Sequence, residues 1–571
     1  MNETAVATDF DAIVTGSGIT GGWAAKELTE KGLKVLVLER GREITHGVDY
    51  LGEHAPDWKL PYQGKKPREL YQADYPVQSG SYAFNEATRH LWNNDRLNPY
   101  HQDPDKPFNW MRADVVGGRS ILWARQSYRW CEQDFNANRD DGHGIPWPIG
   151  YRDLAPWYDY VEDFIGVSGQ AEGLPQLPDG KFLPPMGMLA LEKTIKQRLA
   201  RNAPDVTLTM GRTATLTQEH QGRAACHYCG PCHRGCSTGS YFSSLSSTLP
   251  AARKTGNLTL VANAVVEKLA YDPVSGRVAA VHVIDSETRK RRRYTGKLFF
   301  LCAGAVASTQ ILLNSSSAAF PRGLANSSGV LGHYLMDHYS AFGGVGLFMD
   351  NLDRYFHGNR PNNTYIPRFR NVGGQDEDAD FVRGYGYQNV PVRSDWFFTM
   401  NSRGFGAELK NRLRKPGPWM WMMGAFGECL PYRDNRISLH PGKVDRFGIP
   451  QVSASFQWGD NERAIDRDMR KQGDRILKAA GAVMNFSNLS AEPAEQPGGS
   501  AIHEMGTARM GDDPTQSVLN AHNQAHDAPN LYVTDGSAMT SSSCVNPSLT
   551  YMALTARACN HAVKQLAQGW V

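Results

Sequence analysis

The sequence predicts an α/β fold, in which helices and strands are mixed around a Rossmann-like parallel sheet. An apolar run at residues 10–15 is followed by a glycine-rich turn, a helix-like stretch and a second apolar run at 34–38. Two further apolar runs, at 298–302 and 530–534, end in small or turn-forming residues, as buried parallel strands often do. The chain has 571 residues, of which 41% are hydrophobic and 21% charged, so it can bury a large core.

The charge and hydropathy of the chain exclude several classes of protein. Lys plus Arg number 61 and Asp plus Glu 58, so the formal net charge is only +3, which argues against nucleic-acid binding. No apolar run approaches the ~20 residues that span a bilayer, so we expect no direct membrane span. Residues 1–11 contain no basic segment, no apolar segment and no twin arginine, so we do not expect a secretory signal there.

The glycine turn has the G-x-G-x-x-G spacing of a dinucleotide-binding site. Gly16 allows the tight turn, Gly18 lets the backbone approach a pyrophosphate, and Gly21 allows close packing of the helix predicted over Trp23–Lys31. The start of a helix also supplies free N–H groups and a positive dipole end. Glu39 ends the second strand, where its carboxylate can accept hydrogen bonds from both ribose hydroxyls. These features predict FAD or NAD rather than NADP.

Other segments resemble those of the glucose–methanol–choline (GMC) family of FAD oxidoreductases. Residues 116–123 form a glycine turn followed by Trp123, and residues 546–568 begin with Asn-Pro and continue as an amphipathic helix. The matches comprise residues 16–21, Glu39, 116–123, Val266, 302–305, 332–338, 503–511, 535–537 and 546–554. They are spread over nearly the whole chain and together are highly specific. The resemblance implies the GMC fold, with a Rossmann-like FAD domain and a discontinuous, sheet-based substrate domain.

The resemblance also implies which residues contact FAD. Asp535 and Gly536 would meet the pyrophosphate and the ribityl chain, and the helix that starts at Pro547 would point its positive end at the flavin's pyrimidine ring. The predicted cofactor contacts are Gly16, Gly18, Gly21, Glu39, Gly118, Ser120, Val266, Ala303, Asp535, Gly536, Pro547 and Leu549. Some members of the family attach FAD covalently to a His just before the Trp of the glycine-turn loop. Leu122 occupies that place here, so we expect non-covalent FAD.

His503 and Asn546 are the predicted catalytic pair. Oxidation of an alcohol by hydride transfer leaves a proton to remove, and a neutral imidazole can accept it near neutral pH. The segment around His503 resembles the family's catalytic-histidine segment, and Asn546 matches a second catalytic position that is His or Asn in the family. The amide of Asn546 could hold the substrate hydroxyl while staying uncharged. We expect structural roles for His333, His338 and His561.

Four of the nine cysteines form the run C-x2-C-x2-C-x3-C in a loop at residues 224–238. This spacing is typical of bacterial ferredoxins and predicts an iron-sulfur cluster bound by Cys226, Cys229, Cys232 and Cys236. A structural zinc site, disulfides and free thiols are the alternatives. GMC-type bacterial glucose dehydrogenases carry a 3Fe–4S cluster with the spacing of Cys226, Cys232 and Cys236, and the extra thiol of Cys229 leaves a 4Fe–4S cluster open. A cluster beside FAD would take electrons from the reduced flavin one at a time.

Both domains are predicted to be discontinuous. The FAD-binding domain is predicted at 1–50, 110–130, 215–345 and 500–571, and the substrate-binding domain at 51–109, 131–214 and 346–499. The aromatic residues Trp396–Phe398, Trp419–Trp421 and Tyr432 indicate either core packing or a platform for a sugar ring. The loop at residues 181–186 is similar to one in sugar-oxidising members of the family.

These features predict an FAD-dependent dehydrogenase, rather than an oxidase, that acts on a carbohydrate. Our leading hypothesis is oxidation of the secondary hydroxyl at C3 of a glucoside or hexose. The alternatives are C1 or C2 of glucose, C2 of gluconate, and a pyranose oxidase-like reaction. A further alternative is an electron-transfer flavoprotein without an alcohol substrate, which would not need His503 and Asn546.

The resemblance also suggests partners and a compartment. Related multi-subunit dehydrogenases pair a flavoprotein that has no signal of its own with a small twin-arginine-exported subunit and a cytochrome c. Co-export with such a subunit would place this chain in the periplasm. A cytoplasmic enzyme fits the sequence equally well.

Overall fold

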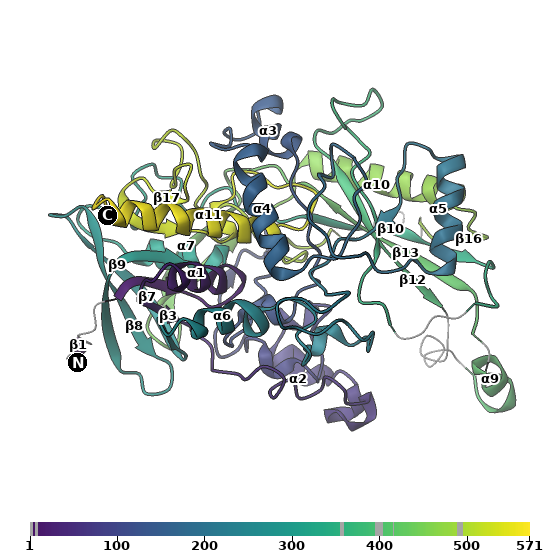
Figure 1. Ribbon diagram of the computed structural model, residues 1–571, viewed down its shortest axis with the longest axis horizontal. Helices are drawn as coiled ribbons and strands as arrows, with labels where there is room; N and C mark the ends of the chain where they lie inside the picture. Colours follow the sequence, from purple (N-terminus) through teal and green to yellow (C-terminus); the bar gives the residue numbers. More distant parts are fainter. Residues whose placement is uncertain (1–3, 6–9, 355–358, 394–403, 415, 488–494) are drawn as a thin grey trace.

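The computed structural model describes residues 4–5, 10–354, 359–393, 404–414, 416–487 and 495–571. A nine-stranded sheet lies toward the left of Figure 1. Its main path runs in the order β17 (Gln524–Ala525), β18 (Ala528–Val533), β9 (Arg291–Leu301), β2 (Phe10–Thr15), β3 (Val35–Leu38) and β6 (Leu258–Val261). The strands from β18 to β6 are parallel. The strands β1 (Thr4–Ala5), β7 (Ala264–Asp272) and β8 (Arg277–Asp285) extend the sheet beside β9.

Helices cover this first sheet. Helix α1 (Ile19–Glu30) packs on β2 and β3 and against α11 (Ser548–Ala567), which in turn contacts α4 (Tyr151–Ile165). Helix α7 (Ala305–Asn314) packs against β7. The strands and the C-terminal helix that the sequence predicts are therefore confirmed. Helix α1 begins four residues earlier than predicted, because Gly21 and Gly22 in its first turns interrupt the apolar pattern.

A second, six-stranded sheet lies toward the right of Figure 1. Its order is β16 (Met484–Asn485), β10 (Tyr339–Phe348), β13 (Trp419–Gly427), β12 (Tyr385–Arg393), β11 (Thr364–Ile366) and β5 (Thr209–Met210), with every neighbouring pair antiparallel. Helix α10 (Asp460–Ala479) packs on β10, and α5 (Ala190–Asn202) packs against α10. The predicted domain boundaries stay a prediction. Strand β10 runs across the predicted boundary at residue 345.

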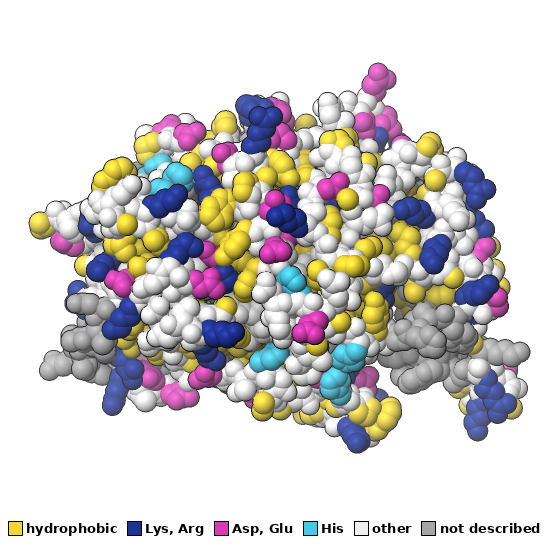
Figure 2. All heavy atoms as spheres, viewed as in Figure 1, with side chains coloured by type: hydrophobic (Ala, Val, Ile, Leu, Met, Phe, Trp, Pro, Cys, Tyr) yellow, Lys and Arg dark blue, Asp and Glu magenta, His cyan; other side chains and the backbone are white. Residues whose placement is uncertain are grey.

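The remaining elements are small. A three-stranded sheet contains β14 (Arg436–Val444), β15 (Pro450–Ser455) and β4 (His101–Gln102). The remaining α-helices of the described residues are α2 (Arg68–Asp74), α3 (Glu132–Asp141), α6 (Leu249–Lys254) and α9 (Gly406–Leu413). Among the described residues, no helix combines the length and the apolar character needed to cross a bilayer. On the face drawn in Figure 2, acidic and basic side chains are interspersed.

The aromatic residues of β13 do not form a sugar platform. Trp419 and Trp421 are fully buried, together with Met423, in the core that α10 and α5 make with the second sheet. Side chains alternate between the two faces of a strand, and these face the helices. Tyr432 instead donates its hydroxyl to Glu462. Of the two alternatives, core packing is therefore the one that the structure shows for Trp419 and Trp421. Trp396–Phe398 lie outside the described residues.

Gly473 marks a close contact between α10 and the second sheet and provides a test of this packing. A Cβ at this position would lie 2.0 Å from the backbone oxygen of Gly343 on β10. We therefore expect Gly473→Ala to destabilise the protein by roughly 1–3 kcal/mol, because overpacking forces the helix away from the strand. Thermal unfolding of the holoenzyme measures the effect. Gly442→Ala is the control, since no atom lies within 4 Å of the added Cβ; equal shifts in both variants would contradict the packing argument.

Candidate active site

A cavity of about 440 Å³ lies between the two sheets. The first sheet contributes the carboxyl ends of its parallel strands, including Thr15 of β2 and Leu38 of β3. The second sheet contributes Ser340, Gln388 and Phe426 from β10, β12 and β13. Ligands of open α/β sheets bind at the carboxyl ends of the strands, so the cavity lies where a nucleotide is expected.

The glycine turn and Glu39 form one end of the cavity. The buried Glu39 carboxylate accepts hydrogen bonds from the Ser17 backbone N–H at 3.0 Å, the Ser17 hydroxyl at 2.6 Å and the Gly41 N–H at 2.8 Å. Burial raises the pKa of Glu39, and these donors oppose that shift. A Cβ on Gly21 would lie 2.0 Å from the Gly16 oxygen, whereas a Cβ on Gly18 would meet no atom within 4 Å. Gly21 therefore serves packing, and the space over Gly18 is open.

The structure brings most of the predicted cofactor residues together. Those that line the cavity are Gly16, Gly18, Glu39, Gly118, Ser120, Val266, Ala303, Asp535, Gly536 and Pro547. Gly21 and Leu549 do not line it, because both are buried in packing contacts of α1 and α11. Asp535 accepts hydrogen bonds from the Ser308 hydroxyl and the Gly304 and Ser537 N–H groups. These donors oppose the rise in the pKa of Asp535 that burial causes.

His503 and Asn546 meet at the other end of the cavity. Asn546 Nδ2 lies 3.1 Å from His503 Nε2, and both residues line the cavity. Burial, the neighbouring His338 and the cation of Arg119 hold the pKa of His503 well below its usual range. The imidazole is therefore neutral near neutral pH, so its Nε2 lone pair can accept a proton.

Sequence reasoning missed two of the three residues that hold this pair, Asp337 and Gln388, and gave the third, His338, only a structural role. His338 Nδ1 lies 2.9 Å from His503 Nδ1, and Gln388 Nε2 donates to Asn546 Oδ1 at 2.6 Å. The Asp337 carboxylate accepts the backbone N–H of His503 at 3.0 Å. Asp337 and His338 belong to the segment 332–338, and the resemblance of that segment to the family was the signal that could have identified both residues. Gln388 had no such signal.

An ion pair neutralises the charge beside His503. Arg119 donates to both carboxylate oxygens of Glu504, at 2.8 and 2.7 Å, and both residues line the cavity. Bidentate pairs of this kind have a defined geometry as well as a favourable energy. Because Glu504 follows His503 directly, the pair also anchors the backbone that carries the imidazole.

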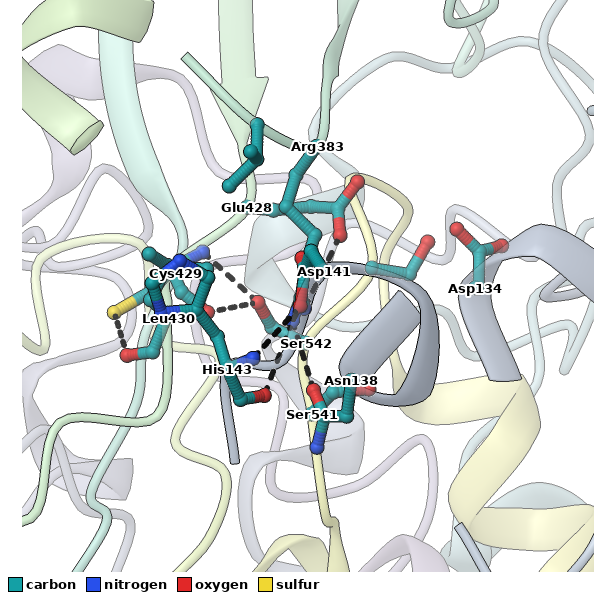
Figure 3. A network of polar contacts seen from close by, with 12 residues as sticks. Asp134, Asn138, Asp141, His143, Arg383, Glu428, Cys429, Leu430, Ser541 and Ser542 are labelled. Atoms are coloured by element: carbon teal, nitrogen blue, oxygen red, sulfur yellow. Dashed lines mark hydrogen bonds and ion pairs between the residues drawn. The ribbon is translucent and has the colours of Figure 1, made fainter. Parts of the chain in front are cut away.

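A buried polar network positions the segment that leads to Asn546 (Figure 3). Ser542 Oγ accepts the Cys429 N–H and donates to the Cys429 carbonyl oxygen, both at 2.9 Å. Asn138 of α3 donates to the Thr540 carbonyl at 3.1 Å, and Arg383 of the second sheet's neighbouring loop donates to Asn138 Oδ1 at 2.8 Å. The network therefore ties the approach to Asn546 to α3 and to the second sheet.

The cysteine loop lies beside the cavity, but it does not form a ready-made metal site. All nine cysteines are free. Burial and the three neighbouring thiols raise the pKa of Cys226 to about 11. Burial also raises the pKa of Cys232, and the cation of Arg125, which lines the cavity, opposes that rise. Within the described part of the chain, no three His, Cys, Asp or Glu side chains are grouped closely enough to hold a metal ion.

Local hydrogen bonds orient these thiols separately. Cys226 Sγ accepts the Tyr228 N–H at 3.4 Å, and Cys236 Sγ lies 3.3 Å from Thr238 Oγ1. The predicted ligands Cys226, Cys229, Cys232 and Cys236 are thus neighbours in one loop without forming a ligand cage. As placed, they do not fit an iron-sulfur cluster.

Comparison with known proteins identifies the family. Residues 10–340 and 431–555 match the family described as GMC oxidoreductase. The chain belongs to this family. It is 29% identical to the 2-methyl-1,2-propanediol dehydrogenase of Mycolicibacterium austroafricanum, over 97% of this chain and 95% of the relative. It is 26% identical to the fructose dehydrogenase large subunit of Gluconobacter japonicus, over 100% of both chains. The fold is similar to that of a formate oxidase of Aspergillus oryzae, with a TM-score of 0.61, 14% identity and 100% of both chains covered.

GMC oxidoreductases bind FAD and act on CH–OH donors, and the cavity fits that cofactor. The open space over Gly18 lies at the start of α1, where N–H groups and the helix dipole favour a pyrophosphate. Glu39 stands at the end of β3, as a ribose partner requires. The roles of the individual residues toward FAD stay predictions.

Asp337→Asn should remove a pH dependence of stability. Burial, and then the charge of Glu504, raises the pKa of Asp337 to about 7. Because the folded-state pKa is raised, the stability that Asp337 contributes is complete below the unfolded-state pKa of about 4 and is lost as the pH rises toward 7. The thermal midpoint of the wild-type holoenzyme should therefore fall more steeply between about pH 5 and pH 8 than that of Asp337→Asn. Asp512→Asn, an exposed control, should keep the wild-type slope; equal slopes in all three proteins would contradict the assignment.

Proposed function

We propose that this chain is an FAD-dependent dehydrogenase that oxidises a secondary hydroxyl of a sugar to a ketone. The observation that carries the proposal is the pairing of His503 Nε2 with Asn546 Nδ2, 3.1 Å apart, in a cavity shared with the nucleotide-binding turn. A hydroxyl oxygen placed against this pair can reach both nitrogens. Such an arrangement suits removal of the O–H proton while the carbinol carbon loses a hydride.

His503 and Asn546 have different tasks in this reaction. When bound, FAD supplies the acceptor for the hydride that leaves the carbinol carbon. The substrate O–H donates to His503 Nε2, and the proton moves to that nitrogen as the C–O bond becomes a carbonyl. Asn546 donates an N–H to the substrate oxygen and stabilises the negative charge that develops there. Because Asn546 is uncharged, it does not compete with His503 for the proton.

The nature of the site supports an alcohol substrate over a pure electron-transfer role. An electron-transfer flavoprotein needs no base beside an amide in its cavity, whereas this chain has both residues on the cavity wall. A sugar is supported by the fructose dehydrogenase relative and by the polar Gln126 and Gln388 along the cavity wall. Our leading candidate remains C3 of a glucoside or hexose. C1 or C2 of glucose, C2 of gluconate and a pyranose oxidase-like reaction are the alternatives.

We also propose an iron-sulfur cluster, of the 3Fe–4S or 4Fe–4S type, at Cys226, Cys229, Cys232 and Cys236. The spacing of the four cysteines supports it, but the loop would have to rearrange for the thiols to converge. The name of the fructose dehydrogenase relative describes a large subunit, which supports an assembly with a small twin-arginine-exported subunit and a cytochrome c. Co-export would make the chain periplasmic; a cytoplasmic location is the alternative.

His503→Ala tests the proposed base. The variant should keep non-covalent FAD, because His503 is replaced at the substrate end of the cavity, but it should lose flavin reduction by about 10²–10⁴-fold. Anaerobic stopped-flow mixing with glucose, methyl glucoside, lactose and gluconate measures the loss, and NMR of the product identifies the oxidised carbon. His561→Ala on α11 is the control, since its ring stacks on His522 and does not line the cavity. Near-normal reduction by His503→Ala would end the assignment.

Iron analysis of anaerobically purified protein tests the proposed cluster. We expect about three to four iron atoms per flavin, with a matching amount of acid-labile sulfide and an electron paramagnetic resonance signal. Cys226→Ser and Cys236→Ser should lose the iron, and Cys229→Ser should lose it only if the cluster is 4Fe–4S. Cys131→Ala, outside the loop, should keep it. An iron-free protein with full activity toward an electron acceptor would contradict the cluster.

A further inference from the structure

Gln388 reaches the catalytic pair from the second sheet. It lies on β12, opposite Tyr365 of β11 on one side and Gly424 of β13 on the other, and it lines the cavity. Its Nε2 donates to Asn546 Oδ1 at 2.6 Å, the only hydrogen bond that this oxygen makes within the described residues. The contact joins β12 to the start of α11 across the cavity.

This hydrogen bond decides which way the Asn546 amide points. The carboxamide has an acceptor on one side and a donor on the other. With Oδ1 held by Gln388, the NH2 group faces His503 Nε2, at 3.1 Å. Turned by half a rotation, the amide would present its oxygen to Nε2 instead. In that orientation the amide oxygen can form a hydrogen bond with Nε2 only if Nε2 carries a hydrogen. A protonated Nε2 has no lone pair with which to accept a proton from the substrate.

The second nitrogen of His503 completes the chain. When Nε2 is an acceptor, the neutral imidazole carries its hydrogen on Nδ1, which lies 2.9 Å from His338 Nδ1. His338 then accepts at Nδ1 and carries its own hydrogen on Nε2, a buried nitrogen that makes no hydrogen bond within the described residues. Burial lowers the pKa of His338 to about 4, so this ring is neutral as well. The hydrogens in the row Gln388, Asn546, His503 and His338 thus all run in one direction.

We propose that Gln388 is a positioning residue for the oxidation: it orients the Asn546 amide and thereby keeps His503 Nε2 as the unprotonated, hydrogen-bond-accepting nitrogen that can act as the base. The inference rests on the proposed function and deepens it, since Gln388 acts through Asn546. The group that orients the Asn546 amide is the Nε2 donor of Gln388. A side chain of similar size that has no hydrogen-bond donor should not orient Asn546.

Gln388→Glu gives the proposal a distinctive pH signature. An ionised Glu can only accept hydrogen bonds, so it would draw the Asn546 NH2 group to itself and turn Oδ1 toward His503. A protonated Glu donates and restores the original orientation. The variant should therefore regain activity as the pH falls, whereas a carboxylate that acted only by raising the pKa of His503 would lower activity as the pH falls.

The other titratable and charged groups around this point do not obscure the signature. His503 and His338 have pKa values lowered by burial, that of His338 to about 4. Tyr365 lies opposite Gln388 and has its pKa raised by burial. The Arg119–Glu504 pair, Asp337 and Arg125 also lie near the cavity, and all are present in every variant compared. The same holds for the other charged or titratable residues that line it, which are Glu39, Arg40, Tyr82, Arg112, Asp114, Asp535 and Tyr551.

The experiment measures the rate of anaerobic flavin reduction by a sugar that reduces the wild type, between about pH 5 and pH 8. The variants are Gln388→Glu, Gln388→Leu and the control Val390→Ala, an exposed residue of the same strand that does not line the cavity. FAD content, the flavin spectrum and the deuterium isotope effect at the reacting carbon are measured on the same samples.

We expect Gln388→Leu to reduce its flavin about 10²-fold more slowly than the wild type at every pH, with unchanged FAD content. Gln388→Glu should be similarly slow at neutral pH and at least 10-fold faster at the acid end than at neutral pH. Val390→Ala should match the wild type. The isotope effect should be retained in the slow variants, because the chemical step limits them.

Two results would overturn the proposal. One is wild-type reduction by Gln388→Leu. The other is a Gln388→Glu variant that is slow with the same pH profile as Gln388→Leu, or that loses activity as the pH falls. Failure of the proposed function is a separate outcome: no sugar or other alcohol would reduce the wild-type flavin, or His503→Ala would reduce it at the normal rate.

Discussion

The hydrogen bond between Asn546 and His503 is the contact on which the rest of the site depends. Its two residues come from segments that different parts of the molecule hold in place. Asn546 precedes α11, which packs against α1 and α4, while Asp337, shortly before β10, holds the backbone of His503. A displacement of either sheet would separate the two nitrogens, so the packing between the sheets is also a condition for the chemistry.

The protein keeps this pair in an environment of low net charge. Arg119 and Glu504 neutralise each other beside His503, and the Glu39 and Asp535 carboxylates are surrounded by N–H and O–H donors. Burial then disfavours the charged imidazole, and the base stays neutral. A charged group that lost its partner here would cost several kcal/mol, which explains why the ion pair is bidentate.

The cysteine loop shows the limit of an argument from spacing. Four thiols within eleven residues can reach one cluster if their backbone turns correctly, and the sequence contains the spacing for it. In the structure two of the four thiols make local contacts of their own, Cys226 with the Tyr228 N–H and Cys236 with the Thr238 hydroxyl. Spacing determines which ligands are near one another, whereas side-chain orientation determines whether they converge.

The sequence by itself predicted the strands and the glycine turn of the first sheet, and it named His503 and Asn546, which the structure places side by side and whose catalytic roles stay a prediction. Strands β2 and β3, the turn at Gly16 and the acid at Glu39 are neighbours in the chain, so local patterns encode them. Only the tertiary structure decided what surrounds His503. Gln388, His338 and Arg119 lie between 100 and 400 residues away from His503 in the sequence. No periodic pattern of residue types indicates that they are its neighbours. Their contacts form only when the two sheets pack together. The order of residues along the chain does not show which side chains face each other after that packing.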